Sequence, residues 1–210
     1  MLNLFFVRHG ETEWNVERRL QGRLDSKLTS KGIHDARLLA KRLATTEFEA
    51  VISSPSNRAV HTAKILTENR SVSIVTDERL MEIHLGHWQG KTIDEIQTID
   101  SMKYDCYVNH PDQYKRDDGG EDFLDVKDRL EEFLASVEEK HDSGNVLIVT
   151  HGVVVKVLQL ICKNLPLNRL WDPPEIDGTS LTIVQSNQGE RKLIMEGDVA
   201  HKDNIKNNII

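Results

Sequence analysis

The 210-residue chain is predicted to be an α/β protein, with three α/β/α layers, a mostly parallel central sheet and a helical cap insertion. Short apolar runs typical of strands alternate along the chain with segments whose apolar residues recur at helical spacing. Two of the runs, 2–7 and 145–150, are apolar almost throughout, as expected of strands covered on both faces. Only the stretch from 77 to about 120 breaks the alternation. We interpret it as a cap inserted into a single domain that spans 1–210.

The first half of the chain contains three predicted strands and two helices. Residues 2–7 form the first strand, and apolar residues at helical spacing predict a helix that begins near Thr29 or Ser30, either of which could be its N-cap. The apolar run 50–54 is the next strand. Pro55 opens a second helix, and 72–76 is the third strand.

The second half begins with the cap, in which Thr92 and Glu95 have capping-box spacing at the start of a helix. A long helix with one apolar stripe follows over about 121–141, and 145–150 is the fourth strand. The segment 153–162 is a helix or another buried segment, because its β-branched start is poor for an isolated helix. Two strands, 180–186 and 192–197, close the fold, and the polar tail after 200 is expected to be frayed.

Composition and charge exclude some classes of function. A net charge of −7 argues against a nucleic-acid binder but leaves room for a local cationic pocket. No apolar run is long enough to span a membrane, and the first strand is too short for a signal peptide. Cys106 and Cys162 lie far apart without metal-ligand spacing, which suggests a reducing compartment. We therefore expect a cytoplasmic protein.

Charged and polar residues gather where the predicted strands end. Arg8 and His9 follow the first predicted strand, and His151 and Gly152 follow the fourth predicted strand. Arg58 lies in the first turn of the helix that follows the second predicted strand. Ligands of such sheets bind beyond the carboxyl ends of the strands. Forked arginine donors and a helix N-terminus at one place suit a phosphate group. Zinc is a weaker alternative, since no carboxylate or cysteine completes a ligand set and the arginines would repel the metal.

Five stretches of the sequence together resemble the histidine phosphatase superfamily, which includes the cofactor-dependent phosphoglycerate mutases and many phosphatases. In chain order they are "FFVRHGETEWN", "QGRLDSKLTSKGIHDA", "VISSPSNRAVHTA", "RLMEIHLGHWQG" and "VLIVTHG". The resemblance covers most of residues 1–160. It implies a histidine phosphatase domain that needs no metal and no cofactor.

The resemblance also assigns roles to individual residues. It implies that His9 is the nucleophile and that Glu82 is the proton donor; spacing alone leaves Glu78 as an alternative acid. The predicted catalytic and phosphate-binding residues are His9, Glu82, His151, Arg8, Arg58, Asn15, Gln21, Gly22 and Gly152.

The sequence around Glu82 is more similar to that of the broad phosphatase branch, which includes α-ribazole-phosphate phosphatases, than to that of the mutases. The expected function is therefore a metal-independent phosphatase that hydrolyses small-molecule phosphomonoesters through a phosphohistidine. The alternatives are a cofactor-dependent phosphoglycerate mutase and, in another class, a non-catalytic phosphate- or nucleotide-binding module. The expected partner is a small phosphorylated substrate, and homo-oligomerisation is left open. Asp122 stands where this branch often has serine, either repelling acidic substrates or capping the long helix.

Overall fold

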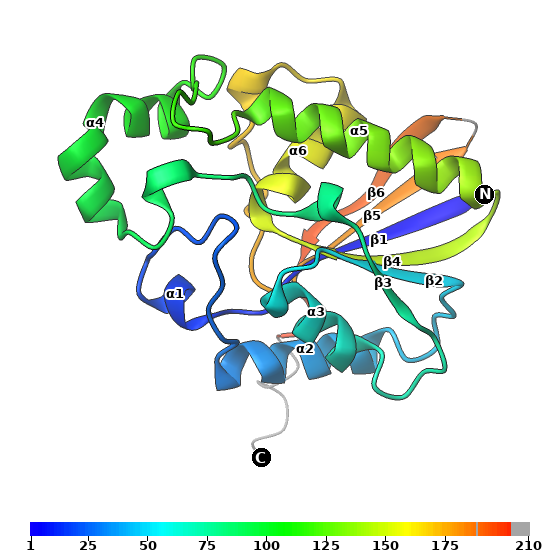
Figure 1. Ribbon diagram of the computed structural model, residues 1–210. Helices are drawn as coiled ribbons and strands as arrows, with labels where there is room; N and C mark the ends of the chain where they lie inside the picture. The colour runs from blue at the N-terminus through cyan, green and yellow to red at the C-terminus, as the bar shows by residue number, and fades with distance from the viewer. Residues whose placement is uncertain (188, 203–210) are drawn as a thin grey trace.

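The central sheet has six strands in the order β3-β2-β4-β1-β5-β6 (Figure 1). The computed structural model describes residues 1–187 and 189–202. The strands are β1 (Leu2–Arg8), β2 (Ala50–Ser53), β3 (Ile74–Thr76), β4 (Gly144–Thr150), β5 (Leu181–Asn187) and β6 (Glu190–Asp198). The neighbours among the first four are parallel, whereas β5 runs antiparallel to β1 and β6 antiparallel to β5. The predicted α/β class with a mostly parallel sheet is confirmed.

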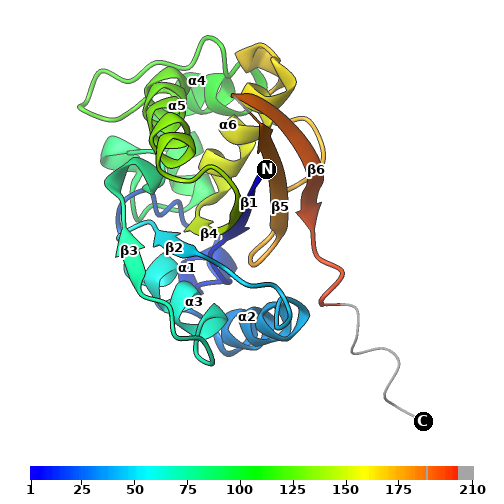
Figure 2. The same ribbon diagram turned by 90° about the vertical axis from the view of Figure 1, so that its right-hand side faces the viewer.

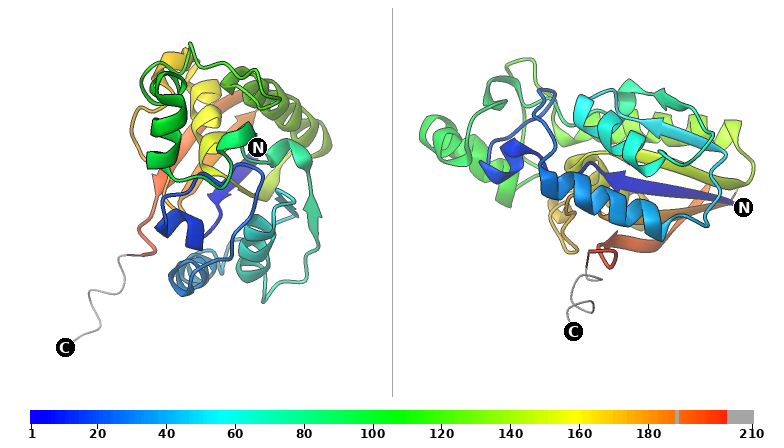
Figure 3. Two further views of the ribbon diagram at one scale, coloured as in Figure 1. Left: turned by 60° about the vertical axis from the view of Figure 1, so that its left-hand side comes forward. Right: turned by 90° about the horizontal axis from the view of Figure 1, so that it is seen from below.

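Helices cover both faces of the sheet, which gives the predicted three layers (Figure 2). The α-helices are α1 (Glu13–Val16), α2 (Ser30–Arg42), α3 (Asn57–Leu66), α4 (Ile93–Asn109), α5 (Phe123–Lys140) and α6 (Gly152–Lys163). Three short 3-10 helices are η1 (Glu78–Leu80), η2 (Gly86–Trp88) and η3 (Leu167–Arg169). Helices α2 and α3 pack on one face and α5 and α6 on the other, while α4 lies beyond the end of the sheet (Figure 3).

The alternation of side chains along the central strands divides the core into two clusters. Leu4 and Phe6 of β1 pack with α5 and α6, whereas Val7 packs with α2 and α3. In β4, Ile148 and Val149 divide in the same way. Successive side chains of a strand point to opposite faces, so a strand between two helical layers must be apolar at every position.

The segment between β3 and α5 packs around one tryptophan. Trp88 is fully buried, and its ring centroid lies 5.9 Å from those of Tyr107 and Tyr114. Its indole N–H donates to Asp100 at 2.9 Å, at the residue where α4 departs from helical geometry. These aromatic residues belong to the same core cluster as α5 and α6. The segment is therefore packed on the layer it covers.

Two predicted segments are settled by burial. The segment 153–162 is helix α6, and Val153, Val154 and Val155 are all buried, so tertiary packing overrides their low helix propensity. The expectation of a frayed tail is wrong at His201, which is buried and lies 3.0 Å from the hydroxyl of Thr179. The rest of that expectation, residues 203–210, lies outside the described residues. Within the described part of the chain, no helix combines the length and apolarity that crossing a membrane requires.

Candidate active site

The two predicted histidines lie side by side because the two central strands deliver them in register. β1 and β4 are parallel neighbours, with Arg8 paired to Thr150. His9 and His151 directly follow these two paired residues, and their ring centroids are 5.2 Å apart. The backbone N–H of His9 also donates to the carbonyl of Thr150 at 2.9 Å. The strand pairing itself therefore sets the distance between the two imidazoles.

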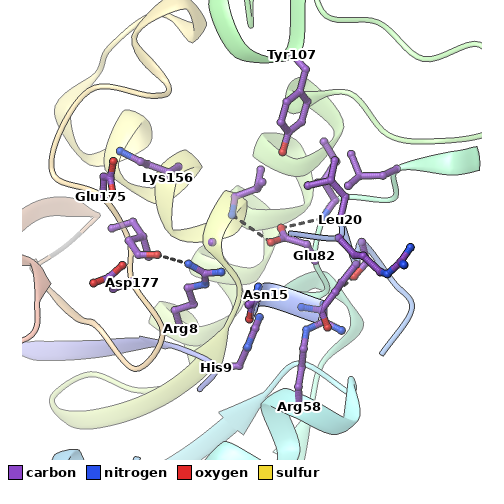
Figure 4. A pocket seen from close by; sticks show the side chains of 18 of the residues that line it. Arg8, His9, Asn15, Leu20, Arg58, Glu82, Tyr107, Lys156, Glu175 and Asp177 are labelled. Atoms are coloured by element: carbon purple, nitrogen blue, oxygen red, sulfur yellow. Dashed lines mark hydrogen bonds between the residues drawn. The ribbon is translucent and has the colours of Figure 1, made fainter. Parts of the chain in front are cut away.

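A cavity of about 410 Å³ opens beyond these strand ends (Figure 4). All predicted site residues except His151 line it: Arg8, His9, Asn15, Gln21, Gly22, Arg58, Glu82 and Gly152. His151 is fully buried and contacts Arg58. The structure thus brings together residues from five separate parts of the chain.

The ring of His9 has one nitrogen committed and one available. Its Nδ1 lies 2.8 Å from the carbonyl oxygen of Gly10. A carbonyl oxygen only accepts, so Nδ1 carries the proton and Nε2 carries the lone pair. Burial lowers the pKa of His9 well below its usual value, and the charges of Arg58 and Arg8 lower it further. His9 is therefore a neutral imidazole with a free nitrogen at neutral pH.

His151 has the opposite tautomer. Its Nδ1 lies 3.1 Å from the Nη2 of Arg58, which can only donate, so Nδ1 accepts. Its Nε2 is 2.7 Å from the Ser54 hydroxyl and donates to it. Burial lowers the pKa of His151 well below its usual value, and the charge of Arg58 adds to this effect. His151 is neutral, and it fixes one edge of the Arg58 guanidinium.

Both arginines of the site keep one buried N–H without a partner. The Nη1 of Arg8 donates to the Ile176 carbonyl at 2.5 Å, while no acceptor in the described chain reaches its Nε. Arg58 has acceptors on both terminal nitrogens, and its Nε is likewise buried and unpaired. An unsatisfied buried donor is costly, and donors of this kind usually have a partner. Two of them near one cavity indicate a place for anionic oxygens.

Glu82 is positioned by two backbone donors, one from the next residue and one from the first turn of α6. Its two carboxyl oxygens accept from the N–H groups of Ile83 at 3.0 Å and Val153 at 3.3 Å. Burial raises the pKa of Glu82, against the opposing effect of these hydrogen bonds and of the two arginines. Glu78, which the spacing left open, is exposed and does not line the cavity. Glu82 is therefore a buried carboxyl group in the cavity wall whose raised pKa favours the protonated form.

The residues between β1 and α2 support the cavity in different ways. Asn15 uses its amide oxygen for Thr12, which leaves its amide nitrogen for the cavity. The amide of Gln21 donates to Thr12 and accepts from Ser26, so this side chain holds the loop. Gly22 has a φ of +53°, which a side chain would strain.

The outer wall of the cavity was not predicted from the sequence. It includes Tyr107 from α4 and four residues after α6: Trp171, Glu175, Ile176 and Asp177. Lys156 adds a buried ammonium that donates to the carbonyls of Asp172 and Pro174, the latter at 2.8 Å. The run "WDPPEIDG" has no strand or helix periodicity. Its position after α6, the helix that follows β4, is the one sequence signal that could have pointed to the site.

Asp122 caps helix α5, which decides between its two predicted roles. Its carboxylate accepts from the N–H groups of Leu124 at 2.8 Å and Asp125 at 3.3 Å. It also pairs with Lys115 and is absent from the cavity wall. In the described part of the chain, no group of three or more histidine, cysteine, aspartate or glutamate residues is arranged to hold a metal ion.

Comparison with known proteins places the chain in a family. The family model described as "Histidine phosphatase superfamily (branch 1)" matches residues 4–198. The chain belongs to this superfamily. The predicted family is confirmed, and the match supports the predicted phosphoric monoester hydrolase.

Individual relatives of this histidine phosphatase cover most of its length. The solved structure of Bacillus stearothermophilus YhfR is 47% identical, with a TM-score of 0.93 over 96% of this chain and 99% of that one. Phosphoserine phosphatase 1 of Hydrogenobacter thermophilus is 30% identical and covers 81% of each chain. A probable phosphoglycerate mutase GpmB of Serratia proteamaculans is 36% identical, over 79% of this chain and 77% of its own.

Proposed function

We propose that the chain is a metal-independent phosphatase that hydrolyses small-molecule phosphomonoesters through a phosphate carried on His9. One observation carries the proposal. A neutral imidazole with a free nitrogen, two unpaired arginine N–H groups and a carboxyl of raised pKa lie around one cavity. These are the nucleophile, the oxyanion donors and the acid that phosphoryl transfer without a metal needs.

In the first step, the phosphate oxygens accept from the Nε–H groups of Arg8 and Arg58. The lone pair on Nε2 of His9 then forms a bond to phosphorus as the ester P–O bond breaks. Glu82 gives its proton to the departing oxygen and becomes a carboxylate. The Nδ1–H bond to the Gly10 carbonyl keeps the ring oriented and stabilises the positive charge on the phosphorylated imidazole.

In the second step, the Glu82 carboxylate takes a proton from water, and the water oxygen bonds to phosphorus. The P–N bond breaks, its electron pair returns to Nε2 of His9, and inorganic phosphate leaves. The rim residue Asp177 has a side chain that is 64% exposed, and we infer that water enters the cavity at this edge. An accessible rim favours hydrolysis over a mutase reaction, in which water must be kept from the phosphohistidine.

The same proposal includes a cap and a cellular location. The segment 77–120 would act as the cap of a single domain spanning 1–210, because Leu85 and Tyr107 reach the cavity wall. The cytoplasm suits the free thiols of Cys106 and Cys162. A homo-oligomer stays a prediction that gel filtration with light scattering would test.

The test is hydrolysis of p-nitrophenyl phosphate in the presence of EDTA, with His9→Ala as the matched variant. We expect turnover by the unsubstituted chain, none by His9→Ala, and phosphate on residue 9 when the reaction is stopped under alkaline conditions and digested for mass spectrometry. Loss of turnover in EDTA, or full activity of His9→Ala, would contradict the proposal. Isomerisation of 3-phosphoglycerate that depends on 2,3-bisphosphoglycerate would show a mutase instead.

A further inference from the structure

Helix α3 carries Arg58 in its first turn but does not cap its own N-terminus. The N-cap residue Ser56 makes no side-chain capping bond. The cap comes from a distant loop: Asp25 accepts from the N–H groups of Asn57 at 2.8 Å and Arg58 at 3.3 Å. A carboxylate at this place satisfies open N–H groups and interacts favourably with the helix dipole.

The same carboxylate holds the arginine side chain. Oδ1 of Asp25 also accepts from Nη1 of Arg58 at 2.7 Å, and the Arg58 side chain is only 1% exposed. In the described chain, Asp25 is the one carboxylate within ion-pair distance of this guanidinium. A buried cation without a partner is costly, so Asp25 makes burial of Arg58 tolerable.

Two backbone carbonyls of the same loop also accept from the terminal nitrogens of the guanidinium. The carbonyl of Leu24 accepts from Nη1 at 2.6 Å, and that of Gly22 accepts from Nη2 at 2.7 Å. With His151 also on Nη2, both terminal nitrogens have partners, and the unpaired donor is Nε–H. Asp25 and its neighbours therefore decide which edge of the guanidinium is left for a ligand.

Capping from a distance also leaves Ser56 available to the second histidine. The Ser56 hydroxyl lies 3.4 Å from Nε2 of His151 and 3.4 Å from the hydroxyl of Ser54, which is the stronger partner of that ring. A serine engaged in capping α3 would have to turn away from this network. One carboxylate thus holds the arginine directly and leaves Ser56 free to contact His151.

We propose that Asp25 is a positioning residue of the active site, which acts by holding Arg58 with its Nε–H directed at the substrate phosphate. The proposal rests on the proposed function, because it assumes that Arg58 meets a phosphate group. It assigns to Asp25 no contact with the substrate, and Asp25 does not line the cavity.

The test compares Asp25→Ala with Asp122→Ala, which removes a matched helix cap. Asp122 caps α5 with the same pair of distances, 2.8 Å and 3.3 Å, and also has an ion-pair partner, but it is not in the cavity wall. Both variants should lower the thermal midpoint, Asp25→Ala by more, because it also leaves the buried Arg58 without its carboxylate whereas Lys115 is 61% exposed. Only Asp25→Ala should raise KM and the inhibition constant of inorganic phosphate, each roughly tenfold to a hundredfold, the range expected when a charge-assisted hydrogen bond is lost.

Asp25→Asn separates the two tasks of the carboxylate. Asparagine caps helices as well as aspartate does, so the thermal midpoint should recover the part of the loss that comes from the missing cap. The amide lacks the charge that pairs with Arg58, so the inhibition constant of phosphate should stay raised. A merely structural Asp25 would instead let Asp25→Asn recover stability and phosphate binding together.

A double-mutant cycle with Arg58→Ala completes the test, with phosphate binding measured by calorimetry. If Asp25 acts through Arg58, adding Asp25→Ala to Arg58→Ala should change phosphate affinity no further. Additive losses, or an Asp25→Ala variant that binds phosphate like Asp122→Ala, would overturn the proposal. Failure of the proposed function looks different: the unsubstituted chain would hydrolyse no phosphomonoester, while phosphate binding could still be compared among the variants.

Discussion

Replacing Glu82 by glutamine should separate phosphoryl transfer from proton transfer. Glutamine keeps the size of the side chain and one oxygen to accept from Ile83 or Val153, but it has no proton to release. General acid catalysis contributes about a hundredfold to ten-thousandfold, or about 2.7 to 5.4 kcal/mol of barrier. This loss should appear in kcat/KM for an alkyl phosphate, whose leaving oxygen needs a proton.

The same variant should behave differently toward p-nitrophenyl phosphate, because p-nitrophenolate leaves without being protonated. For this substrate, kcat/KM of Glu82→Gln should fall by no more than about tenfold, since it reports only the transfer to His9. Hydrolysis of the phosphohistidine still needs the base, so kcat should fall by about a hundredfold or more. The assay is stopped flow, in which a burst of p-nitrophenolate close to one equivalent should precede a slow steady state.

The comparison of the two substrates is the critical result. An equal loss of kcat/KM for the alkyl and the aryl ester would mean that Glu82 does not protonate the leaving group. A variant with no burst and an undiminished steady state would mean that Glu82 is not the base either. Inorganic phosphate should inhibit the variant and the unsubstituted chain to a similar degree, which serves as a control for intact folding of the site.

Three further outcomes follow from burial and charge. For alkyl phosphates, activity should fall at acid pH as His9 takes up a proton, and at alkaline pH as Glu82 loses its proton. The lowered pKa of His9 places the acidic limb below pH 6.5. A series of kcat/KM measurements against pH checks both limbs. The folded-state pKa of Glu82 is raised above its ordinary value of 4.5, so ionisation of this buried group costs stability as pH rises. The thermal midpoint of Glu82→Gln should therefore rise relative to that of the unsubstituted chain between pH 4 and pH 8. A difference in thermal midpoint that stays constant with pH would contradict this direction. Trp88→Ala removes a fully buried ring and should lower the free energy of unfolding, measured by urea denaturation, by about 3 to 5 kcal/mol. KM should also rise, because Trp88 packs against Tyr107, which lines the cavity.

The sequence predicted that Arg8, His9 and His151 lie together because their placement depends on local patterns. Apolar runs identified β1 and β4, and the rule that ligands bind beyond strand ends placed Arg8, His9 and His151 together. The structure puts these side chains around one site, as that reasoning requires. Their chemical roles stay predictions until the variants are measured.

What the sequence did not predict depends on contacts between distant segments. Asp25 lies in a polar loop without periodicity, and nothing local shows that it pairs with Arg58 in helix α3. The wall formed by Trp171 and Ile176 follows α6 without a recognisable pattern. His201 lies in a polar tail, and its burial comes from packing near Thr179 rather than from its own neighbours.

The pairing of β1 with β4 has a consequence for how such a protein can change. The two imidazoles follow adjacent strands in the middle of the sheet, so their spacing is tied to the hydrogen-bonded pairing of β1 with β4. The surfaces that would touch the rest of a substrate belong to α4 and to the segment after α6. If the chain is the proposed phosphatase, substitutions there can alter selectivity while the two imidazoles keep their spacing, which makes the outer wall the place to engineer a new substrate preference.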